Sequence, residues 1–257
     1  MKTFENIEDW RRFRDEMIHH GQTLAFVPTM GALHSGHLSL VQAAQKKYDH
    51  VLVSIFVNPT QFNNKDDLEK YPRSLDRDLA TLSSANTDFV LLPLEKQIYA
   101  DQNKFKVLES DESKILCGAH RPGHFDGVLT VMTKLLGLAR AEACYMGEKD
   151  FQQFRLVDQL ARSFFLSTRI VGCPTVREPS GLAMSSRNER LSAAGREKAA
   201  LIYRALENST SCEEARRVLT DSGFEVEYCE EHWGRRLIAA NLEGVRLIDN
   251  MAIEARS

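Results

Sequence analysis

Hydrophobic and polar positions along the chain follow two alternating patterns. Short apolar runs of the kind buried on both faces of a parallel sheet alternate with stretches in which apolar residues recur at helical spacing. Over the first 175 residues this alternation repeats several times, which predicts a doubly wound parallel sheet. The runs predicted as strands are Leu24–Val27, His50–Val57, Phe89–Pro93, Lys104–Leu108, Ala143–Met146 and Thr168–Cys173.

Five stretches between and before these runs have the helical period. The opening one runs from Ile7 to Gly21, with Gly21 as the expected C-terminal cap. The others are Leu38–Lys47, Leu75–Ser84, Val128–Leu138 and Phe151–Ser163. Strand, helix and strand within residues 24–57 predict a right-handed βαβ unit.

The pattern changes after Val176. Residues 177–188 contain proline, glycine and three serines without an apolar period, which predicts a loop or a domain junction. A helix with Ser192 as its N-cap, a helix over 211–222 and strands over 224–229 and 245–250 follow. We therefore predict an α/β, Rossmann-like parallel-sheet domain at 1–175 and a smaller α+β C-terminal domain at 176–257.

Composition narrows the class of protein. The 257 residues are 43% hydrophobic and 27% charged, with a formal net charge of −3, as expected of a soluble globular protein with no general affinity for nucleic acid or anionic membranes. No run approaches the roughly 18 apolar residues of a membrane span, and the N-terminus is too polar for a signal peptide. Five cysteines without a CxxC pair predict thiols in a reducing cytoplasm: Cys117, Cys144, Cys173, Cys212 and Cys229.

The first stretch with candidate chemistry is Pro28–His37. It has the order strand, small-residue turn and helix start, which is a common place to hold a phosphate. His34 and His37 are three positions apart, so both rings lie on one helix face about 4.5 Å apart along the axis. Two imidazoles there can donate hydrogen bonds to phosphate oxygens. The alternative is two polar residues at an exposed helix start.

Two further loops carry groups suited to phosphate. In Gly147–Asp150, Lys149 could neutralise a phosphate, while Asp150 could hold a ribose hydroxyl or cap the next helix. In Met184–Arg187, two hydroxyls, backbone N–H groups and a guanidinium can bind a polyphosphate. Each of these motifs alone is a weak signal.

A third group of residues suits a polar acid. Gln61 and Gln153 each offer a donor and an acceptor to a hydroxyl-rich ligand. Asn58, Tyr71, Arg121 and His124 would complete a polar pocket near a carboxylate. The sequence has no paired carboxylates in acid–base spacing, no metal triad and no GxSxG motif, so it does not indicate a covalent mechanism or a protein metal site.

Seven stretches together resemble the pantothenate synthetase (pantoate–β-alanine ligase) family, within the HIGH-motif nucleotidyltransferase superfamily, in which HxGH replaces a P-loop. They occur in order along nearly the whole chain: Pro28–His37, Phe56–Phe62, Tyr71–Arg73, Arg121–Phe125, Gly147–Gln153, Ala183–Asn188 and Arg246–Asn250. Residues 230–240 depart from the family pattern because they are brief and strongly charged. This departure affects the expected details of the C-terminal sheet and not the expected ATP site.

The resemblance implies an ATP-dependent, two-step ligase of pantothenate biosynthesis. Pantoate and ATP give pantoyl adenylate and pyrophosphate, and the β-alanine amine then displaces AMP. Mg²⁺ would bridge the phosphates with few protein ligands, and a homodimer is expected. By resemblance, the catalytic residues are His37, His34, Lys149 and Arg187.

The resemblance also assigns binding residues. Those for ATP are Met30, Gly31, Ala32, Leu33, His34, Ser35, Gly36, His37, Gly147, Glu148, Lys149, Asp150, Val176, Met184, Ser185, Ser186 and Arg187. Gln61 and Gln153 bind pantoate, with Gln61 also near β-alanine. Whether His37 transfers a proton or only donates a hydrogen bond to phosphate stays open.

Three other functions are consistent with parts of the sequence. Another HIGH-type nucleotidyltransferase would join a nucleotide to a different phosphate or acid. An RNA-binding, synthetase-like module would need a basic face, which the net charge of −3 and the lack of a Lys/Arg-rich tract do not supply. A nucleotide sensor would bind ATP without making pantothenate.

Overall fold

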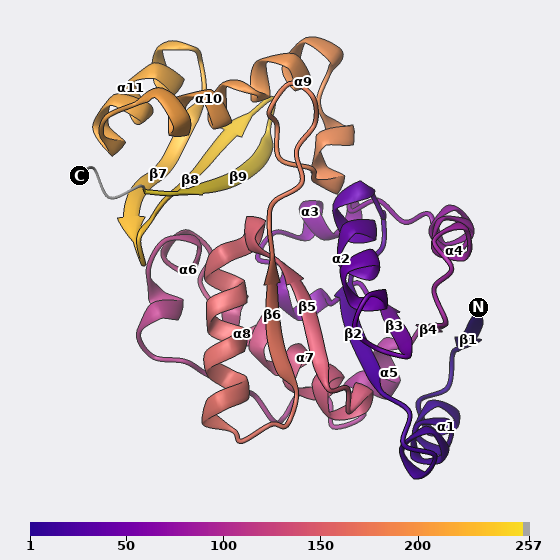
Figure 1. The fold of residues 1–257 in the computed structure, drawn as a ribbon. Helices are drawn as coiled ribbons and strands as arrows, with labels where there is room; N and C mark the ends of the chain where they lie inside the picture. Colours follow the sequence, from indigo (N-terminus) through magenta and orange to yellow (C-terminus); the bar gives the residue numbers. More distant parts are fainter. Residues whose placement is uncertain (254–257) are drawn as a thin grey trace. The chain divides into compact units, whose positions relative to one another are not determined.

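The computed structural model describes residues 1–253, and the chain divides into two compact units (Figure 1). Unit 1 comprises residues 1–148 and 152–173. Unit 2 comprises residues 149–151 and the chain from Pro174 onward. The predicted domain division between residues 175 and 176 stays a proposal, and each unit is described by itself.

Unit 1 is built on a six-stranded sheet in which every neighbouring pair is parallel. The strands are β1 (Lys2–Phe4), β2 (Leu24–Thr29), β3 (His50–Ile55), β4 (Phe89–Leu91), β5 (Ala143–Gly147) and β6 (Arg169–Cys173). Their order, β1-β4-β3-β2-β5-β6, makes β2 and β5 neighbours, with β3 and β6 on their outer sides. The strand order therefore reverses between β2 and β5, which is where open α/β sheets bind ligands.

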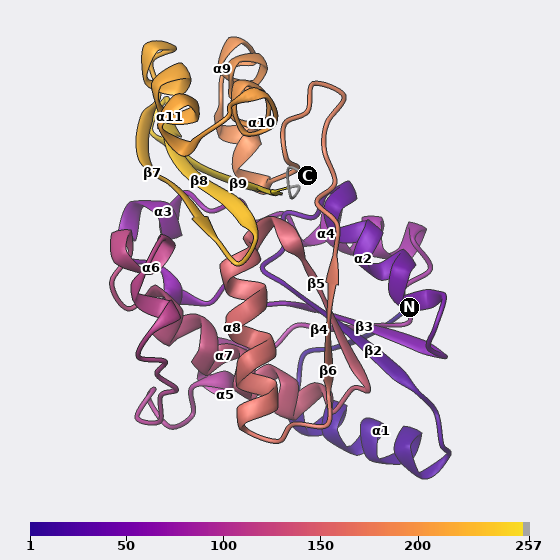
Figure 2. The ribbon, with the colours of Figure 1, turned by 60° about the vertical axis from the view of Figure 1, so that its left-hand side comes forward.

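Helices cover both faces of this sheet (Figures 1 and 2). The longer ones are α1 (Ile7–His19), α2 (Ser35–Gln45), α4 (Leu75–Ser84), α7 (His124–Ala139) and α8 (Phe151–Ser163). The shorter ones are η1 (Pro59–Gln61), α3 (Lys65–Glu69), α5 (Glu95–Ile98), η2 (Glu112–Lys114) and α6 (Cys117–His120). The short helix η3 (Glu148–Asp150) begins at the last residue of this part of unit 1 and continues into the segment 149–151 of unit 2. Helices α2 and α4 lie on one face, and α1, α7 and α8 on the other.

The core of unit 1 follows from the alternation of side chains along β2. Ala25 and Val27 point toward α2 and pack in one cluster with Leu40 and Val41. The intervening Phe26 is also fully buried and points to the opposite face, because strand side chains alternate. A strand apolar on both faces must lie inside the sheet. This burial fixes β2, and with it the start of the loop that follows.

Three predictions for unit 1 were wrong. Residues 104–108 form no strand: the Phe105 N–H donates to the Asp101 carboxylate and the Val107 N–H to the Thr130 hydroxyl, so side chains take the place of a strand partner. Helix α7 begins at His124, before the predicted Val128. The edge strand Lys2–Phe4 was not predicted, because only one of its three residues is buried.

Unit 2 contains a three-stranded antiparallel sheet with helices on one face (Figure 2). Its strands are β7 (Glu225–His232), β8 (Arg235–Leu242) and β9 (Val245–Ala252), and its helices are η4 (Ser186–Arg190), α9 (Ala193–Ala199), α10 (Leu201–Asn208) and α11 (Cys212–Asp221). Ile202, Leu206 and Leu219 from the helices pack with Ile238 and Leu247 from the sheet. Ser192 accepts a hydrogen bond from the Gly195 N–H, which confirms its prediction as an N-cap.

The sequence reading missed strand β8 and helix α10. Two-residue turns join the three strands, Trp233-Gly234 and Glu243-Gly244, and all four residues have positive φ angles between 52° and 72°. These are the angles of the turn that favours an X-Gly pair between paired strands. We expected residues 230–240 to be a charged departure from the family pattern. They contain the end of β7, a two-residue turn and the first part of β8. The predicted α/β sheet with a smaller α+β part is confirmed.

Candidate active site

A buried carboxylate holds the loop that follows β2. Asp78, on α4, is 1% exposed, and its two oxygens accept the N–H groups of Ala32 and Leu33 at 2.8 Å each. The turn needs this support because Gly31 and Ala32 have φ angles of 81° and 50°. A β-carbon at Gly31 would lie 2.9 Å from the Asp78 carboxylate, so the turn approaches α4 too closely for another residue. The amides of Ala32 and Leu33 are therefore occupied by protein.

Sequence reasoning missed Asp78. Its signal was present: Leu75, Asp78 and Leu82 recur at helical spacing, and Leu82 is fully buried. A carboxylate on the apolar face of an amphipathic helix needs a partner. The sequence does not indicate that this partner is the backbone of a loop more than 40 residues earlier.

His34 and His37 form a reciprocal cap at the start of α2. The Nδ1 of His34 accepts the Gly36 N–H at 3.2 Å, and the Nδ1 of His37 accepts the His34 N–H at 3.3 Å. The ring centroids are 4.0 Å apart, but His34 is the extended N-cap residue and precedes the helix, so the two rings do not share a helix face as predicted. A ring nitrogen that accepts a hydrogen bond carries no proton, so each neutral ring has its proton on Nε2. Both histidines can donate from Nε2 to an anion.

Gln61 lies at the end of η1, after β3, and three of the residues predicted to bind the acid contact it. Its side-chain Oε1 accepts from Asn58 Nδ2 at 3.0 Å. Its backbone carbonyl accepts from His124 Nδ1 at 2.8 Å and from Arg121 at 3.2 Å. Arg121 also lies 3.1 Å from His124 Nε2. Because a guanidinium only donates, this Nε2 is an acceptor and His124 is neutral with its proton on Nδ1.

The Gln61 amide connects this cluster to the loop after β2. Its Nε2 donates to the Met30 sulfur at 3.2 Å. Close packing of η1 on α7 makes the arrangement possible, since a β-carbon at Gly127 would lie 2.4 Å from the carbonyl oxygen of Thr60. The predicted ATP residue Met30 and the predicted acid residue Gln61 are therefore in contact within unit 1.

Tyr99 is a second residue that sequence reasoning missed. Its hydroxyl donates to Asn58 Oδ1 at 2.6 Å and lies 2.9 Å from the Thr60 hydroxyl. Burial raises the pKa of Tyr99 above its usual value, so it stays a neutral donor. A lone tyrosine after a short helix carries no distinguishing sequence signal.

The two glutamines at the start of α8 have different surroundings. Gln152 is buried, and its amide bonds to the backbone of Cys117, Glu112 and Ile115. Gln153 is half-buried, and its side-chain amide makes no hydrogen bond to another group within residues 1–253. This difference is consistent with a structural role for Gln152 and with the predicted ligand role for Gln153. Tyr71 is buried, with its ring edge-on to Phe62 at 5.7 Å.

The remaining predicted ATP residues, apart from Gly147 and Glu148 in unit 1, belong to unit 2. The Met184 N–H donates to the Val176 carbonyl at 2.9 Å, closing a turn around Gly181. Ser185 then caps η4 by accepting the Arg187 N–H at 3.3 Å. The Ser185–Arg187 loop is therefore an ordered helix start and not an irregular loop.

The Arg246–Asn250 stretch supports these loops from β9. Asp249 accepts two hydrogen bonds from Arg177, at 2.6 and 3.0 Å, and its side chain is 3% exposed. Burial raises the pKa of Asp249, and Arg177 opposes this. The neighbouring Asn250 donates to the backbone carbonyl of Lys149 at 2.9 Å. Lys149 itself lies 3.5 Å from the Asp150 carboxylate.

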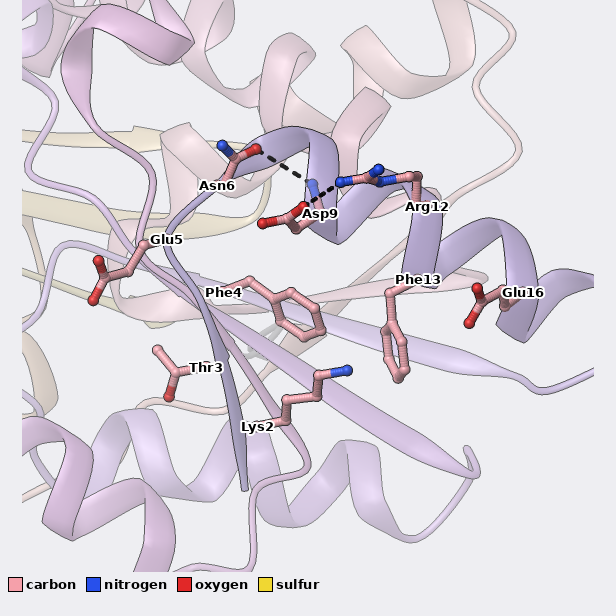
Figure 3. Close-up of a pocket in the computed structure, with 9 residues that line it drawn as sticks. All are labelled: Lys2, Thr3, Phe4, Glu5, Asn6, Asp9, Arg12, Phe13 and Glu16. Carbon is pink, nitrogen blue, oxygen red and sulfur yellow. Dashed lines mark hydrogen bonds and ion pairs between the residues drawn. The ribbon is translucent and has the colours of Figure 1, made fainter.

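A pocket elsewhere in unit 1 includes none of the predicted site residues. It has a volume of about 750 Å³ and is lined by residues 2–6 and by α1 as far as Glu16 (Figure 3). The Lys2 ammonium lies 4.0 Å from the Phe13 ring centroid, and Asp9 pairs with Arg12. Lys2, Asp9 and Arg12 are thus paired with each other or with a ring.

Other features bear on metals, thiols and membranes. Residues 1–253 contain no cluster of three histidine, cysteine or acidic side chains able to hold a metal ion. The five cysteines form no disulfide, as predicted. Within the same residues, no helix has the length and apolar character needed to cross a bilayer.

A parallel sheet with a histidine pair after β2, at the point where the strand order reverses, defines an α/β protein of the nucleotide-binding class. The family model of pantoate-beta-alanine ligase matches residues 2–252. The chain belongs to this family of enzymes, as the resemblance in sequence predicted.

Individual relatives cover nearly the whole chain. A pantothenate synthetase of Bdellovibrio bacteriovorus is 47% identical over 253 residues, 98% of each chain. The structure of a Francisella tularensis pantoate-beta-alanine ligase, complexed with beta-gamma ATP and beta-alanine, matches with a TM-score of 0.93 at 42% identity, covering 98% of this chain and 97% of that one. A pantothenate synthetase of Thermus thermophilus matches with a TM-score of 0.90 at 35% identity, covering 98% and 99%.

Proposed function

We propose that this enzyme condenses pantoate with β-alanine in an ATP-dependent reaction that proceeds through a pantoyl adenylate. Family membership supports the overall reaction. The observation that carries the first step is the histidine pair at the start of α2, whose Nδ1 atoms are occupied by backbone N–H groups, so that both rings donate from Nε2.

In the first step, a carboxylate oxygen of pantoate attacks the α-phosphorus of ATP, and the bond to pyrophosphate breaks. The attack brings two anions together and increases negative charge on the phosphate oxygens. We propose that His34 and His37 donate hydrogen bonds to these oxygens and that Lys149 and Arg187 supply positive charge to the phosphates. Donors fixed before reaction stabilise developing charge without reorganising, and removal of one typically costs ~2.7–4 kcal/mol.

In the second step, the amine of β-alanine attacks the acyl carbon of the adenylate. The bond to the phosphate oxygen breaks, AMP leaves, and the amine proton passes to solvent or phosphate. Gln61 and Gln153 would hold the pantoyl group in both steps, which keeps the carbonyl in place between them. Their neutral amides suit hydroxyl and carboxylate oxygens.

The proposed Mg²⁺ would be bound mainly by the substrate. Since residues 1–253 offer no three-ligand carboxylate or histidine cluster, we propose that the ion arrives on the ATP phosphates, as Mg²⁺ commonly does. There it would neutralise phosphate charge. We also propose that the enzyme acts as a homodimer in the cytoplasm, as the resemblance implies.

One assay tests the function. Purified protein is incubated with ATP, Mg²⁺ and labelled pyrophosphate, with and without pantoate, and exchange of label into ATP is measured. We expect exchange that depends on pantoate and not on β-alanine, and pantothenate only when β-alanine is added. Exchange with CTP, or none with pantoate, would indicate another nucleotidyltransferase. ATP binding without exchange or product would indicate a sensor.

A further inference from the structure

Asn58 was predicted to contact substrate, but Asn58 is only 2% exposed. The hydrogen-bonding atoms of its side chain are all occupied by protein groups. Nδ2 lies 3.2 Å from the Gly127 carbonyl and 3.0 Å from Gln61 Oε1. Oδ1 accepts from the Thr60 hydroxyl at 2.9 Å and from Tyr99 at 2.6 Å. An amide NH₂ has two donors and an amide oxygen two lone pairs, so both ends of Asn58 are satisfied.

These contacts fix which way the Asn58 amide points. The Gly127 carbonyl can only accept, so the atom facing it must be nitrogen. The Thr60 backbone N–H, 3.4 Å away, can only donate, so the atom on its side must be oxygen. Two backbone groups therefore determine the orientation, independently of how any side chain titrates.

The orientation of Asn58 in turn determines that of Gln61. The second Asn58 N–H faces the Gln61 amide, so the Gln61 atom on that side must be the oxygen. Gln61 Nε2 is then directed away from Asn58, toward the Met30 side of the site. One of its two N–H groups reaches the Met30 sulfur, a weak acceptor. The other has no protein partner among residues 1–253.

We infer that Asn58 is a positioning residue that makes Gln61 a hydrogen-bond donor to the acid substrate. Gln61 thus recognises an oxygen acceptor, a carboxylate or a hydroxyl oxygen, and disfavours a ligand that presents an N–H or O–H at the same point. This inference rests on the proposed function, because it concerns the acid that the enzyme activates. The Arg121 and His124 contacts fix the Gln61 backbone, so that only its side-chain amide could reorient.

The first test is kinetic and uses three variants of the full chain. Gln61→Glu replaces the outward donor with an acceptor at nearly constant shape, and we expect the KM for pantoate to rise roughly 10-fold or more with the KM for ATP within about twofold. Gln102→Glu adds the same charge at an exposed position of unit 1 and should leave both constants unchanged. Asn58→Asp should also raise the KM for pantoate, because its carboxylate attracts Nε2 and turns Oε1 outward.

The second test needs no buried substitution. In the ¹⁵N-labelled wild-type protein, the Asn58 amide protons should be protected from exchange with solvent before any ligand is added, and pantoate should not shift them. The Gln61 amide protons, assigned by their absence in Gln61→Glu, should shift and gain protection with pantoate.

The two tests separate this inference from the proposed function. If the wild-type enzyme lacks pantoate-dependent exchange, the proposed function fails. If exchange is normal but pantoate shifts the Asn58 protons and leaves those of Gln61 unchanged, Asn58 itself binds substrate and the inference is overturned. Unchanged KM for pantoate in Gln61→Glu also overturns it.

Discussion

The carboxylate of Asp78 accepts the backbone N–H of Leu33 at 2.8 Å, across 45 residues of sequence. The same carboxylate accepts the Ala32 N–H. It thereby occupies two amides of a glycine turn that, in a P-loop, would face phosphate. The phosphate contacts that we propose at the start of α2 therefore fall to the rings of His34 and His37.

Asp78→Ala should destabilise unit 1. It leaves two buried N–H groups without acceptors, each costing about 1–3 kcal/mol, so we expect the free energy of unfolding to fall by about 2–4 kcal/mol. Urea unfolding can be followed by the fluorescence of Trp10, which is fully buried in unit 1, in a Trp233→Phe background. Asp76→Ala removes an exposed carboxylate from the same helix turn as a control. Equal denaturation midpoints for the two variants would contradict the role of Asp78.

Local pattern was enough to predict much of this molecule. The apolar runs at β2, β3 and β5 and the spacing of His34 and His37 required no knowledge of distant contacts, because burial and helical period are local properties. The resemblance supplied the family. Strand β8 was missed because it begins with two arginines, which made the apolar segment around Ile238 look short. The X-Gly pairs on either side of β8 are typical of turns between strands and could have indicated it.

Contacts between distant residues could not be predicted in this way. Nothing near Asp78 indicates that it binds a turn after β2, and nothing near Tyr99 indicates that it donates to Asn58. Asn58 itself was predicted as a substrate residue because its position after a strand is typical of one. Only the three-dimensional arrangement reveals that its polar atoms are occupied.

Arg177→Met should strongly destabilise unit 2. It leaves the Asp249 carboxylate buried without its cation, and breaking such a pair costs about 3–5 kcal/mol. Burial already raises the pKa of Asp249, and loss of Arg177 removes the opposing effect. A raised folded-state pKa means that the native state holds its proton longer, so the variant should lose stability as pH rises above about 4.

Hydrogen exchange of the β8 and β9 amides measures this effect within unit 2. Exchange should be faster in Arg177→Met than in the wild-type protein, and the difference should grow with pH after correction for the intrinsic rate. Arg217→Met, which removes an exposed arginine from α11, is the matched control. Protection as high as in the control would show that the pair adds nothing to stability.

The Asp101 carboxyl should titrate at unusually low pH. Its hydrogen bond to Lys134, at 2.7 Å, and the Phe105 N–H lower its pKa to about 2. A depressed folded-state pKa contributes stability that is present above the unfolded value of 3.8 and is lost as pH falls through about 2. In Lys134→Met, the midpoint measured by carbon NMR should rise toward 3.8. Lys96→Met, at an exposed position, should leave it unchanged.

Two substitutions of His37 can separate its two roles, which are to accept the His34 N–H at Nδ1 and to donate a hydrogen bond from Nε2. Asparagine places an acceptor near the Nδ1 position, so His37→Asn should retain the bond to the His34 N–H while removing the outward N–H. Glutamine places an N–H near the Nε2 position, so His37→Gln should retain the donor while weakening the cap. We therefore expect His37→Asn to keep its melting temperature and lose adenylate formation by about 2.7–4 kcal/mol of barrier.

The activity of His37→Gln then decides how His37 acts. Because the ring is neutral in this cap, with its proton on Nε2, we expect it to donate a hydrogen bond without transferring the proton. His37→Gln should then exchange pyrophosphate markedly faster than His37→Asn, despite its weaker cap. A side-chain amide does not act as an acid near neutral pH, so if His37 must transfer a proton, both variants will be equally slow. Pantoate-dependent exchange rates at saturating ATP, compared at equal folded fraction, distinguish these outcomes.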